Sequence, residues 1–221
     1  MIRSFILLIA FLSISQFFRG GDAFVQRALR KHTDWLWQLQ ATTSSSSSIA
    51  TAEDIIKFAE KGGVKLSINT LGPAYRAVAR ASHNETLVIG YCEGFVRPTG
   101  NILHLDKMEV FKKSLIKCRE ENPDEFTGGG TVFGVGLLLG CLCLTHGLEN
   151  GCTMAEFLAI DDENFQHKRL VRHYKRLGLN VVRYVGDDLK SIPDRLIWGG
   201  CGTLMEEKIQ TLMEKWTPTF K

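Results

Sequence analysis

The chain has 221 residues, of which 44% are hydrophobic and 23% are charged. This is enough apolar content for one well-packed domain, and it excludes a wholly disordered or fibrous protein. The formal net charge is only +3, and no run of Lys and Arg with interleaved aromatic residues occurs. The composition therefore does not favour a protein that binds nucleic acid.

The first 52 residues have the composition of targeting segments rather than of a folded domain. Arg3 precedes the apolar stretch SFILLIAFLSIS, which is followed by a small-residue site after Ala23, as in a secretory signal peptide. Residues 24–52 are rich in Arg, Lys and Ser, with Asp34 as the only acid, as in an organelle transit peptide. The sequence predicts a signal peptide over 1–23, a transit-like segment over 24–52 and a single domain over 53–221.

Two destinations fit this N-terminus. The combined segment resembles the bipartite presequence of algae with complex plastids, which predicts the plastid stroma; a signal peptide followed by a polar linker would instead predict secretion. The six cysteines have no CxxC or zinc spacing and are interpreted as buried hydrophobic residues, which favours a reducing compartment such as the stroma. A fluorescent reporter fused to residues 1–52 in a diatom separates the two, because signal in the medium would favour secretion.

Hydrophobic patterning predicts the following elements of the mature chain. No metal site is expected, because acids at a helix start are typical caps. No membrane span is expected, because the longest apolar stretch of the mature chain ends well before ~20 residues. In chain order we predict a helix over 53–61, a strand over 64–72, a hairpin over 74–96, a strand ending near Val110, a helical turn and mobile loop over 111–127, a helix over 135–148, a strand over 153–160, a helix over 161–178, strands over 180–186 and 194–200, and a terminal helix over 203–216.

A cluster of glycines precedes the apolar helix. A glycine loop at a helix N-terminus suits phosphate binding, because backbone N–H groups converge there, the helix dipole favours negative charge and absent Cβ atoms allow close approach. The segment TVFGVG, residues 131–136, supplies such a loop. It lacks the Lys-Ser/Thr of an ATP loop and the initial strand and ribose-binding acid of a dinucleotide fold. ATP and NAD are poor candidates, and a purely structural turn is the alternative.

The segments TVFGVGLLL, LENGCTMAEFLAI and HKRLVRHYKRLGLNVVRYV together resemble the core of the GNAT superfamily of acyl-CoA N-acyltransferases, over about residues 101–186. GYCEGF, ILHLDKMEV and LIWGGCGTLM are also similar to plant chloroplast members of that superfamily. The resemblance implies a mixed α/β fold whose central, mostly antiparallel sheet has one splayed parallel strand pair and flanking helices. It implies acetyl-CoA or another acyl-CoA as substrate, and an amine acceptor such as a protein lysine or N-terminal amine.

The resemblance also implies site residues. Tyr174 would give a proton to the departing CoA thiolate. Asp106 is the first choice and Glu109 the second for the base that takes the amine proton, since both lie on the strand before the loop and alternation would place Asp106 on the face of Val110. The implied acyl-CoA contacts are Val110, Thr131, Val132, Phe133, Gly134, Val135, Gly136 and His167.

The sequence departs from the family pattern in several places. Thr131 replaces the usual Arg or Gln, His167 replaces a helix Asn that often contacts the cofactor, and Leu179 replaces a Phe. Residues 111–127 are an insertion, and the turn TLGP leaves no room for the two helices that normally wall the acceptor site. The alternative function is therefore a non-catalytic CoA-binding or protein-interaction module.

Overall fold

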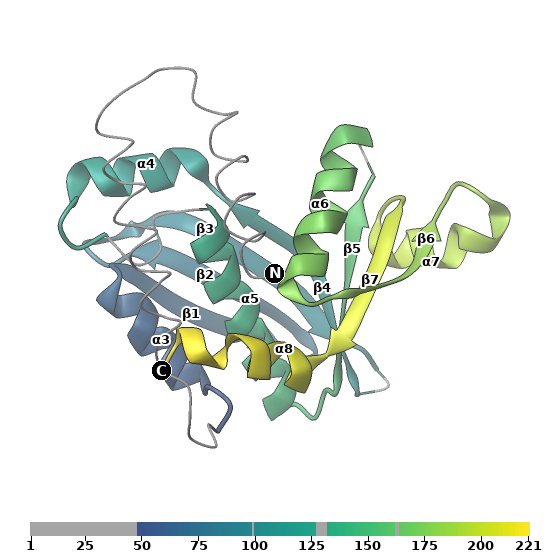
Figure 1. The fold of residues 1–221 in the computed structure, drawn as a ribbon, viewed down its shortest axis with the longest axis horizontal. Helices are drawn as coiled ribbons and strands as arrows, with labels where there is room; N and C mark the ends of the chain where they lie inside the picture. Colours follow the sequence, from purple (N-terminus) through teal and green to yellow (C-terminus); the bar gives the residue numbers. More distant parts are fainter. Residues whose placement is uncertain (1–47, 99, 127–131, 162–163) are drawn as a thin grey trace, which may run out of the picture. The chain divides into compact units, whose positions relative to one another are not determined.

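The computed structural model describes residues 48–98, 100–126, 132–161 and 164–221. Its elements are shown in Figure 1. They are α3 (Ala52–Lys61), β1 (Val64–Leu71), β2 (Ala74–Ala81), β3 (Asn84–Val96), β4 (Ile102–Val110), α4 (Lys112–Glu121), α5 (Val132–Glu149), β5 (Met154–Ile160), α6 (Asn164–Leu177), β6 (Asn180–Val185), α7 (Ile192–Trp198), β7 (Gly202–Lys208) and α8 (Ile209–Trp216), with short 3₁₀ turns at Leu189–Ser191 and Thr217–Thr219.

Within the described residues, seven strands form one sheet in the order β1-β2-β3-β4-β5-β7-β6. Neighbouring strands are antiparallel except β4 and β5, which are parallel. The crossover between this parallel pair contains α4 and α5, because parallel strands cannot be joined by a tight turn. The predicted mixed α/β class, with a mostly antiparallel sheet and one parallel pair, is confirmed.

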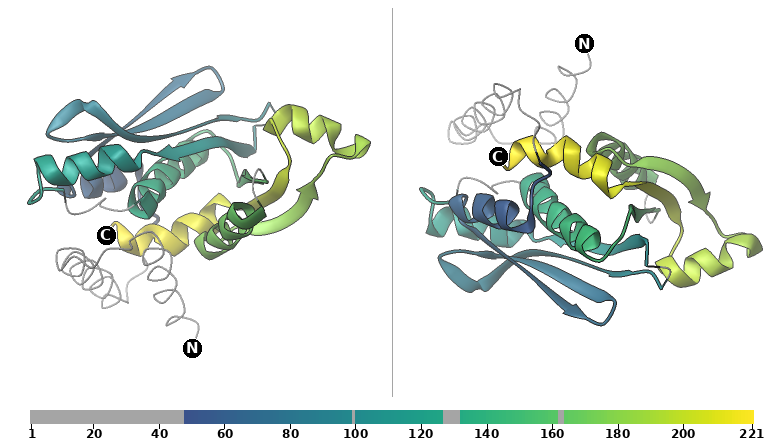
Figure 2. Two further views of the ribbon diagram at one scale, coloured as in Figure 1. Left: turned by 90° about the horizontal axis from the view of Figure 1, so that it is seen from above. Right: turned by 90° about the horizontal axis from the view of Figure 1, so that it is seen from below.

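Helix α5 forms the centre of the core. It is apolar on nearly every side because it packs on the sheet with one face and against α3 and α8 with others. Both views of Figure 2 place α5, α6 and α8 on one side of the sheet and α7 on the other. A separate small cluster beneath α7 consists of Leu158, Val185, Trp198 and Leu204. No helix in the described part of the chain is long and apolar enough to cross a membrane.

The last predicted strand and the terminal helix are misplaced in the sequence expectation. Residues 194–200 belong mainly to α7, which has a proline in its first turn and Gly199 at φ 70° as its C-cap, both typical helix boundaries. The strand is instead β7, which occupies the first half of the predicted helix over 203–216. Strand β7 ends in the charged residues Glu206, Glu207 and Lys208. These residues interrupt its apolar run, and so the segment was predicted as part of an amphipathic helix.

Two further boundaries differ from the expectation. Residues 111–127 contain the ten-residue helix α4 rather than a single helical turn, and this helix buries Leu115 and Cys118. The packed domain begins before residue 53, because Ala50 is buried and its N–H donates to Thr217 Oγ1 at 2.9 Å. All six cysteines are free, and five of them are buried as predicted, with Cys201 partly exposed.

Strands β2, β3 and β4 approach one another closely at His104 of β4. The Tyr75 ring extends from β2 across Gly94 of β3, and its hydroxyl donates to the carbonyl oxygen of His104 at 3.0 Å. A Cβ at position 94 would lie 2.6 Å from Tyr75 Oη and would collide with that same carbonyl oxygen. Only glycine leaves the room that this crossing needs.

We expect Gly94→Ala to lower the free energy of unfolding by about 3 kcal/mol, because the added methyl group meets backbone and a buried ring. The melting temperature should fall by roughly 10 °C. Gly140→Ala is the matched control: its Cβ would meet only Met108 Cε at 3.5 Å, an ordinary contact, so replacing a glycine inside α5 should stabilise the protein by about 0.5–1 kcal/mol. Equal melting temperatures for the two variants would contradict this account.

Candidate functional site

Strands β4 and β5 run side by side over only part of their length. Their parallel pairing covers four residues of each strand and ends at Leu105 and Phe157. Beyond this point β4 continues to Val110, paired with β3 on its other side, and β5 continues to Ile160, paired with β7. The two central strands therefore part as the resemblance implies, and the backbone groups on their facing edges are no longer paired with each other.

The first turns of α5 lie over the parted half of β4. A Cβ on Gly136 would lie 3.6 Å from Met108 Sδ, and one on Gly140 would lie 3.5 Å from Met108 Cε. The start of the helix, at Val132, is therefore close to the gap between the strands. At a helix N-terminus the dipole favours negative charge, so this end of α5 is suited to an anionic group entering the gap.

The predicted loop lies partly inside this helix. Thr131 lies outside the described residues, and so do the side chains of Val132 and Phe133, whose backbone forms the start of α5. Gly134 follows in the first turn. The Val135 side chain is fully buried in the core, so only its backbone remains to face a ligand.

The other two predicted acyl-CoA contacts lie on β4 and α6. Val110 ends β4 opposite Gly90 of β3. His167 Nε2 is 3.0 Å from Thr203 Oγ1, and its Nδ1 is 3.4 Å from Asp161 Oδ2. Both ring nitrogens therefore have partners within the protein, and a contact between His167 and a ligand would require exchange of one of them.

Helix α6 holds Tyr174 against the point where the strands part. The Tyr174 ring centroid lies 4.2 Å from that of Phe157, the last residue of β5 that pairs with β4. Burial raises the pKa of Tyr174 well above its ordinary value, and the nearby Cys92 thiol raises it further. The phenol therefore keeps its proton at neutral pH, which is what a proton donor at this position requires.

Strand β4 has a β-bulge at Asp106. Its neighbours Leu105 and Lys107 pair with adjacent residues of β3, which leaves Asp106 as the extra residue. Alternation cannot be counted across a bulge, so the argument that placed Asp106 on the face of Val110 is wrong. The Asp106 side chain is 49% exposed, and its Oδ1 lies 3.9 Å from His104 Nε2, too far for a hydrogen bond.

Glu109, the second predicted base, already has partners. It accepts a hydrogen bond from Tyr91 Oη at 3.0 Å, and Lys107 Nζ lies 3.5 Å from the same carboxylate. The preceding residue, Met108, faces α5, so alternation directs Glu109 to the opposite side of the sheet. Its role as a base stays a prediction.

Sequence reasoning missed a buried polar network where β4 and β5 are still paired. His104 is fully buried, with Nδ1 3.0 Å from Glu156 Oε1, and Arg97 Nε donates to the same carboxylate oxygen. The His104 ring is stacked between Phe95 at 4.3 Å and Trp198 at 3.8 Å, measured between ring centroids. Each of the two strands carries one polar residue inside an apolar run, ILHL and MAEFL. That pattern was the available sequence signal.

No family model matches the chain, and no curated protein matches it. Similar solved structures include a protein assigned to the GNAT acetyltransferases from Desulfovibrio desulfuricans, 14% identical with TM-score 0.41, covering 62% of this chain and 70% of that one. Another is a GNAT acetyltransferase from Staphylococcus aureus, 13% identical with TM-score 0.40, covering 72% and 92%. A third is an aminoglycoside 6'-N-acetyltransferase complexed with coenzyme A, 12% identical with TM-score 0.37, covering 61% and 73%. At these identities and TM-scores the similarities assign neither a family nor an activity.

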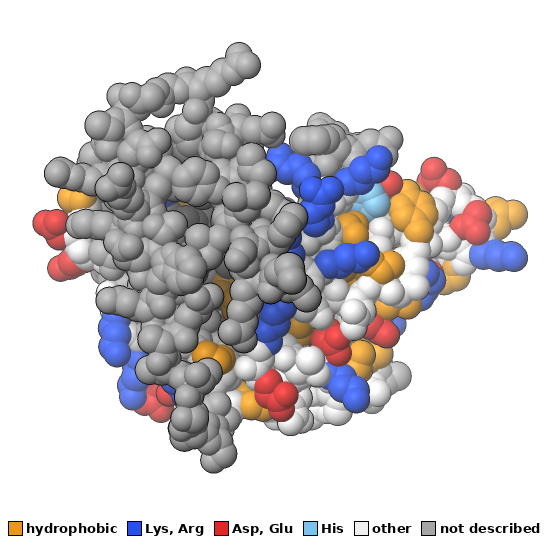
Figure 3. All heavy atoms as spheres, viewed as in Figure 1, with side chains coloured by type: hydrophobic (Ala, Val, Ile, Leu, Met, Phe, Trp, Pro, Cys, Tyr) orange, Lys and Arg blue, Asp and Glu red, His pale blue; other side chains and the backbone are white. Residues whose placement is uncertain are grey.

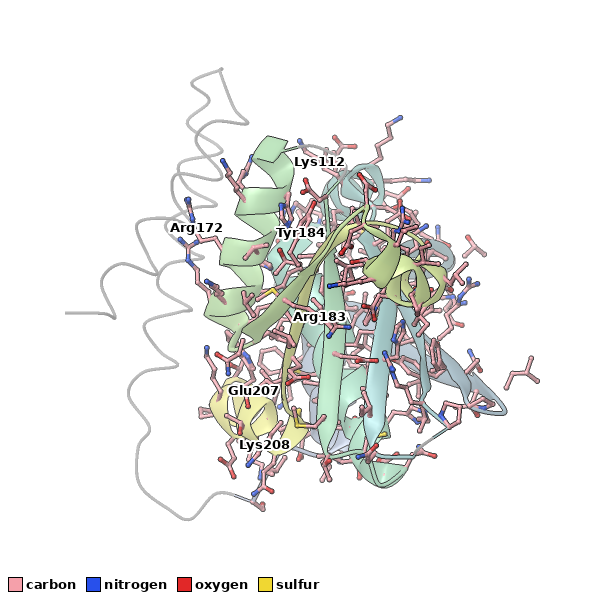
Figure 4. All side chains as sticks on the ribbon, turned by 90° about the vertical axis from the view of Figure 1, so that its right-hand side faces the viewer. Lys112, Arg172, Arg183, Tyr184, Glu207 and Lys208 are labelled. Atoms are coloured by element: carbon pink, nitrogen blue, oxygen red, sulfur yellow. The ribbon has the colours of Figure 1, made fainter. Side chains whose placement is uncertain are left out.

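Helix α6 adds positive charge beside the parted strands. Its sequence, NFQHKRLVRHYKRL, contains no acid. Blue side chains gather over α6 on the face shown in Figure 3, and Figure 4 shows Arg172 projecting from α6 away from the sheet. The exposed basic residues of this helix are Lys168, Arg169, Arg172 and Lys175. A surface of one sign attracts oppositely charged ligands, so this side of the protein favours a polyanion.

Proposed function

We propose that this protein is an acyl-CoA-dependent N-acyltransferase, with acetyl-CoA as the expected donor and an amine as acceptor. The observation that carries the proposal is the parting of β4 and β5 beyond Leu105 and Phe157. Strand edges that stop pairing with each other offer N–H and C=O groups to an extended ligand. The pantetheine arm of coenzyme A, which is narrow and contains amides, has the chemistry to pair with such an edge.

The residues around the parted ends of β4 and β5 suit both the phosphate end and the thioester end of an acyl-CoA. The start of α5 and the basic residues of α6 provide positive potential for its phosphates. Tyr174 is placed against Phe157 at the inner end of the gap, where the thioester of a ligand lying along β4 would arrive. Two of the predicted features, the start of α5 and Tyr174, therefore lie beside the strands where their pairing ends.

The chemistry requires two proton movements. A base must take a proton from the ammonium form of the acceptor before its nitrogen can attack the thioester carbonyl carbon. When the carbon–sulfur bond breaks, Tyr174 gives its proton to the leaving thiolate, which lowers the cost of expelling that group. The products are an amide and the free thiol of coenzyme A.

Calorimetric titration of the full-length chain with acetyl-CoA, followed by a thiol-release assay with lysine-containing peptides, tests the proposal. We expect binding that weakens with added salt, because screening reduces the attraction between phosphates and α6. Arg172→Glu should weaken binding several-fold, whereas Lys57→Glu on α3, whose side chain pairs with Glu53 at 2.6 Å, should leave it unchanged. Binding without thiol release from any amine would support a non-catalytic module, and absence of binding would overturn both functions.

A further inference from the structure

Helix α7 and the 3₁₀ turn before it have an apolar side that is exposed to solvent. Leu189, Ile192 and Leu196 recur at spacings of three and four residues, so they lie along one side of these two turns. Leu189 is 83% exposed and Leu196 is 82% exposed. A single exposed leucine is ordinary, but a continuous apolar stripe on the surface marks a binding surface.

The exposed apolar residues of the described chain are concentrated around this stripe. Eleven large hydrophobic side chains are exposed among the described residues, and eight of them lie between residues 160 and 197. The eight are Ile160, Val181, Val182, Tyr184, Leu189, Ile192, Leu196 and Ile197. Figure 1 places β6 and α7 together at one end of the sheet. This end is therefore the strongest candidate for an interface on the described surface.

The opposite side of α7 is held against the rest of the domain. The Trp198 ring is stacked on that of His104 with 3.8 Å between the ring centroids, and it belongs to the small cluster beneath α7. Arg183 Nη2 donates to Asp194 Oδ1 at 2.7 Å, which joins β6 to α7. The stripe is therefore presented outward by a helix that is fixed on its inner side.

A hollow of about 350 Å³ borders the stripe. It is lined by Ile192, Arg195, Leu196, Gly199, Gly200 and Cys201. Ile160 extends the apolar surface at this hollow, because a Cβ on Gly200 would lie 3.8 Å from Ile160 Cγ1. Leu189 is not part of the lining and extends into solvent. The same face therefore has both a protruding apolar side chain and a partly apolar recess.

We propose that this face binds a second copy of the chain in a symmetric dimer, with the two α7 helices antiparallel. A two-fold axis near Ile192 places Leu189 of one copy opposite Leu196 of the other, where the hollow receives it. The symmetry repeats the same contact on the other side of the axis. Because one surface supplies both the protruding and the recessed part, a second copy completes the fit.

The charges around the stripe favour a second copy over a strongly charged partner. Residues 183–197 contain three acids and three bases, which are Asp187, Asp188, Asp194, Arg183, Lys190 and Arg195. The segment is therefore neutral, and two copies of it do not repel each other through net charge. The basic face of α6 differs in this respect, because two copies of it would repel.

The dimer is independent of the acyltransferase function, because none of Leu189, Ile192 and Leu196 belongs to the candidate site. Two helical turns on each copy bury a small area, and small interfaces form transient complexes. We expect a dissociation constant of about 10 µM.

Sedimentation velocity of the full-length chain between about 1 and 300 µM tests the dimer. We expect one copy at the low end and two at the high end. Leu196→Asp should raise the dissociation constant at least ~100-fold, because a carboxylate would be buried at two symmetric positions. Leu71→Asp is the matched control, since Leu71 is 85% exposed at the end of β1, and it should leave the constant unchanged. A monomer at the highest concentration, or equal constants for the two variants, would overturn the inference.

A mixture of two variants tests the antiparallel arrangement. Leu189→Asp and Leu196→Lys should each dimerise at least ~100-fold more weakly than the unmodified chain. The mixed dimer retains one contact between Leu189 and Leu196 and places the new carboxylate against the new ammonium across the axis. It should therefore form at least ~10-fold more tightly than either variant with itself. Circular dichroism checks that both variants are folded, and no gain on mixing folded variants would contradict the proposed pairing of the helices.

Discussion

Tyr174→Phe is expected to lower kcat for thiol release about 100-fold, with little change in the KM for acyl-CoA. The substitution removes only the hydroxyl, because the ring retains its contacts with Phe157 and His173. The melting temperature should therefore stay close to that of the unmodified protein. A steady-state assay of thiol release at saturating amine measures the effect.

The pH dependence provides a second check on Tyr174. Burial raises the pKa of Tyr174 well above its ordinary value, so the donor stays protonated as pH rises and kcat should show no loss from its ionisation up to about pH 10. Tyr184→Phe is the matched control, because Tyr184 is exposed on β6 and its hydroxyl donates to Asp161 at 2.7 Å. Equal rates for Tyr174→Phe and Tyr184→Phe would remove Tyr174 from the mechanism.

Local patterning was sufficient for most of the fold. The alternating apolar residues of β1 and the helices α3 and α6, each followed by a glycine, agree with the sequence expectation. The apolar run of β5, which is buried in the middle of the sheet, agrees with it as well. The errors fell where the local pattern was short or mixed. Residues 194–200 were predicted as a strand from an apolar run of three residues, although a proline and a glycine at its ends indicate the helix α7. Strand β7 was predicted as part of a helix because it contains three charged residues.

The candidate site was less predictable because it depends on long-range register. Tyr174 was found through a motif on one helix, but its contact with Phe157 depends on how α6 packs on β5. His104 and Glu156 are 52 positions apart and become neighbours only through the parallel pairing of β4 and β5. No pattern in the sequence indicates the bulge at Asp106 either. Such features follow from the assembled sheet and not from any one segment.

Glu156→Leu is expected to lower the free energy of unfolding by about 3 kcal/mol. Glu156 is 5% exposed and neutralises Arg97 while accepting from His104 Nδ1. Removing one partner of a buried ion pair leaves the other charge uncompensated, which costs far more than the pair contributes. Because Arg97 is 26% exposed, part of its charge can reach water, and we expect the lower end of the range known for such losses. Equilibrium unfolding in urea measures it.

Glu156→Gln removes the negative charge of the Glu156 side chain and keeps nearly the same size and shape. The amide oxygen can still accept one hydrogen bond, so the loss of stability should be smaller than with leucine. Glu85→Ala is the control for stability, since Glu85 forms an exposed ion pair with Lys65 at 2.6 Å and such pairs contribute at most about 1 kcal/mol. If Glu156→Leu were as stable as Glu85→Ala, the network around His104 would not be the constraint that holds its ring in place.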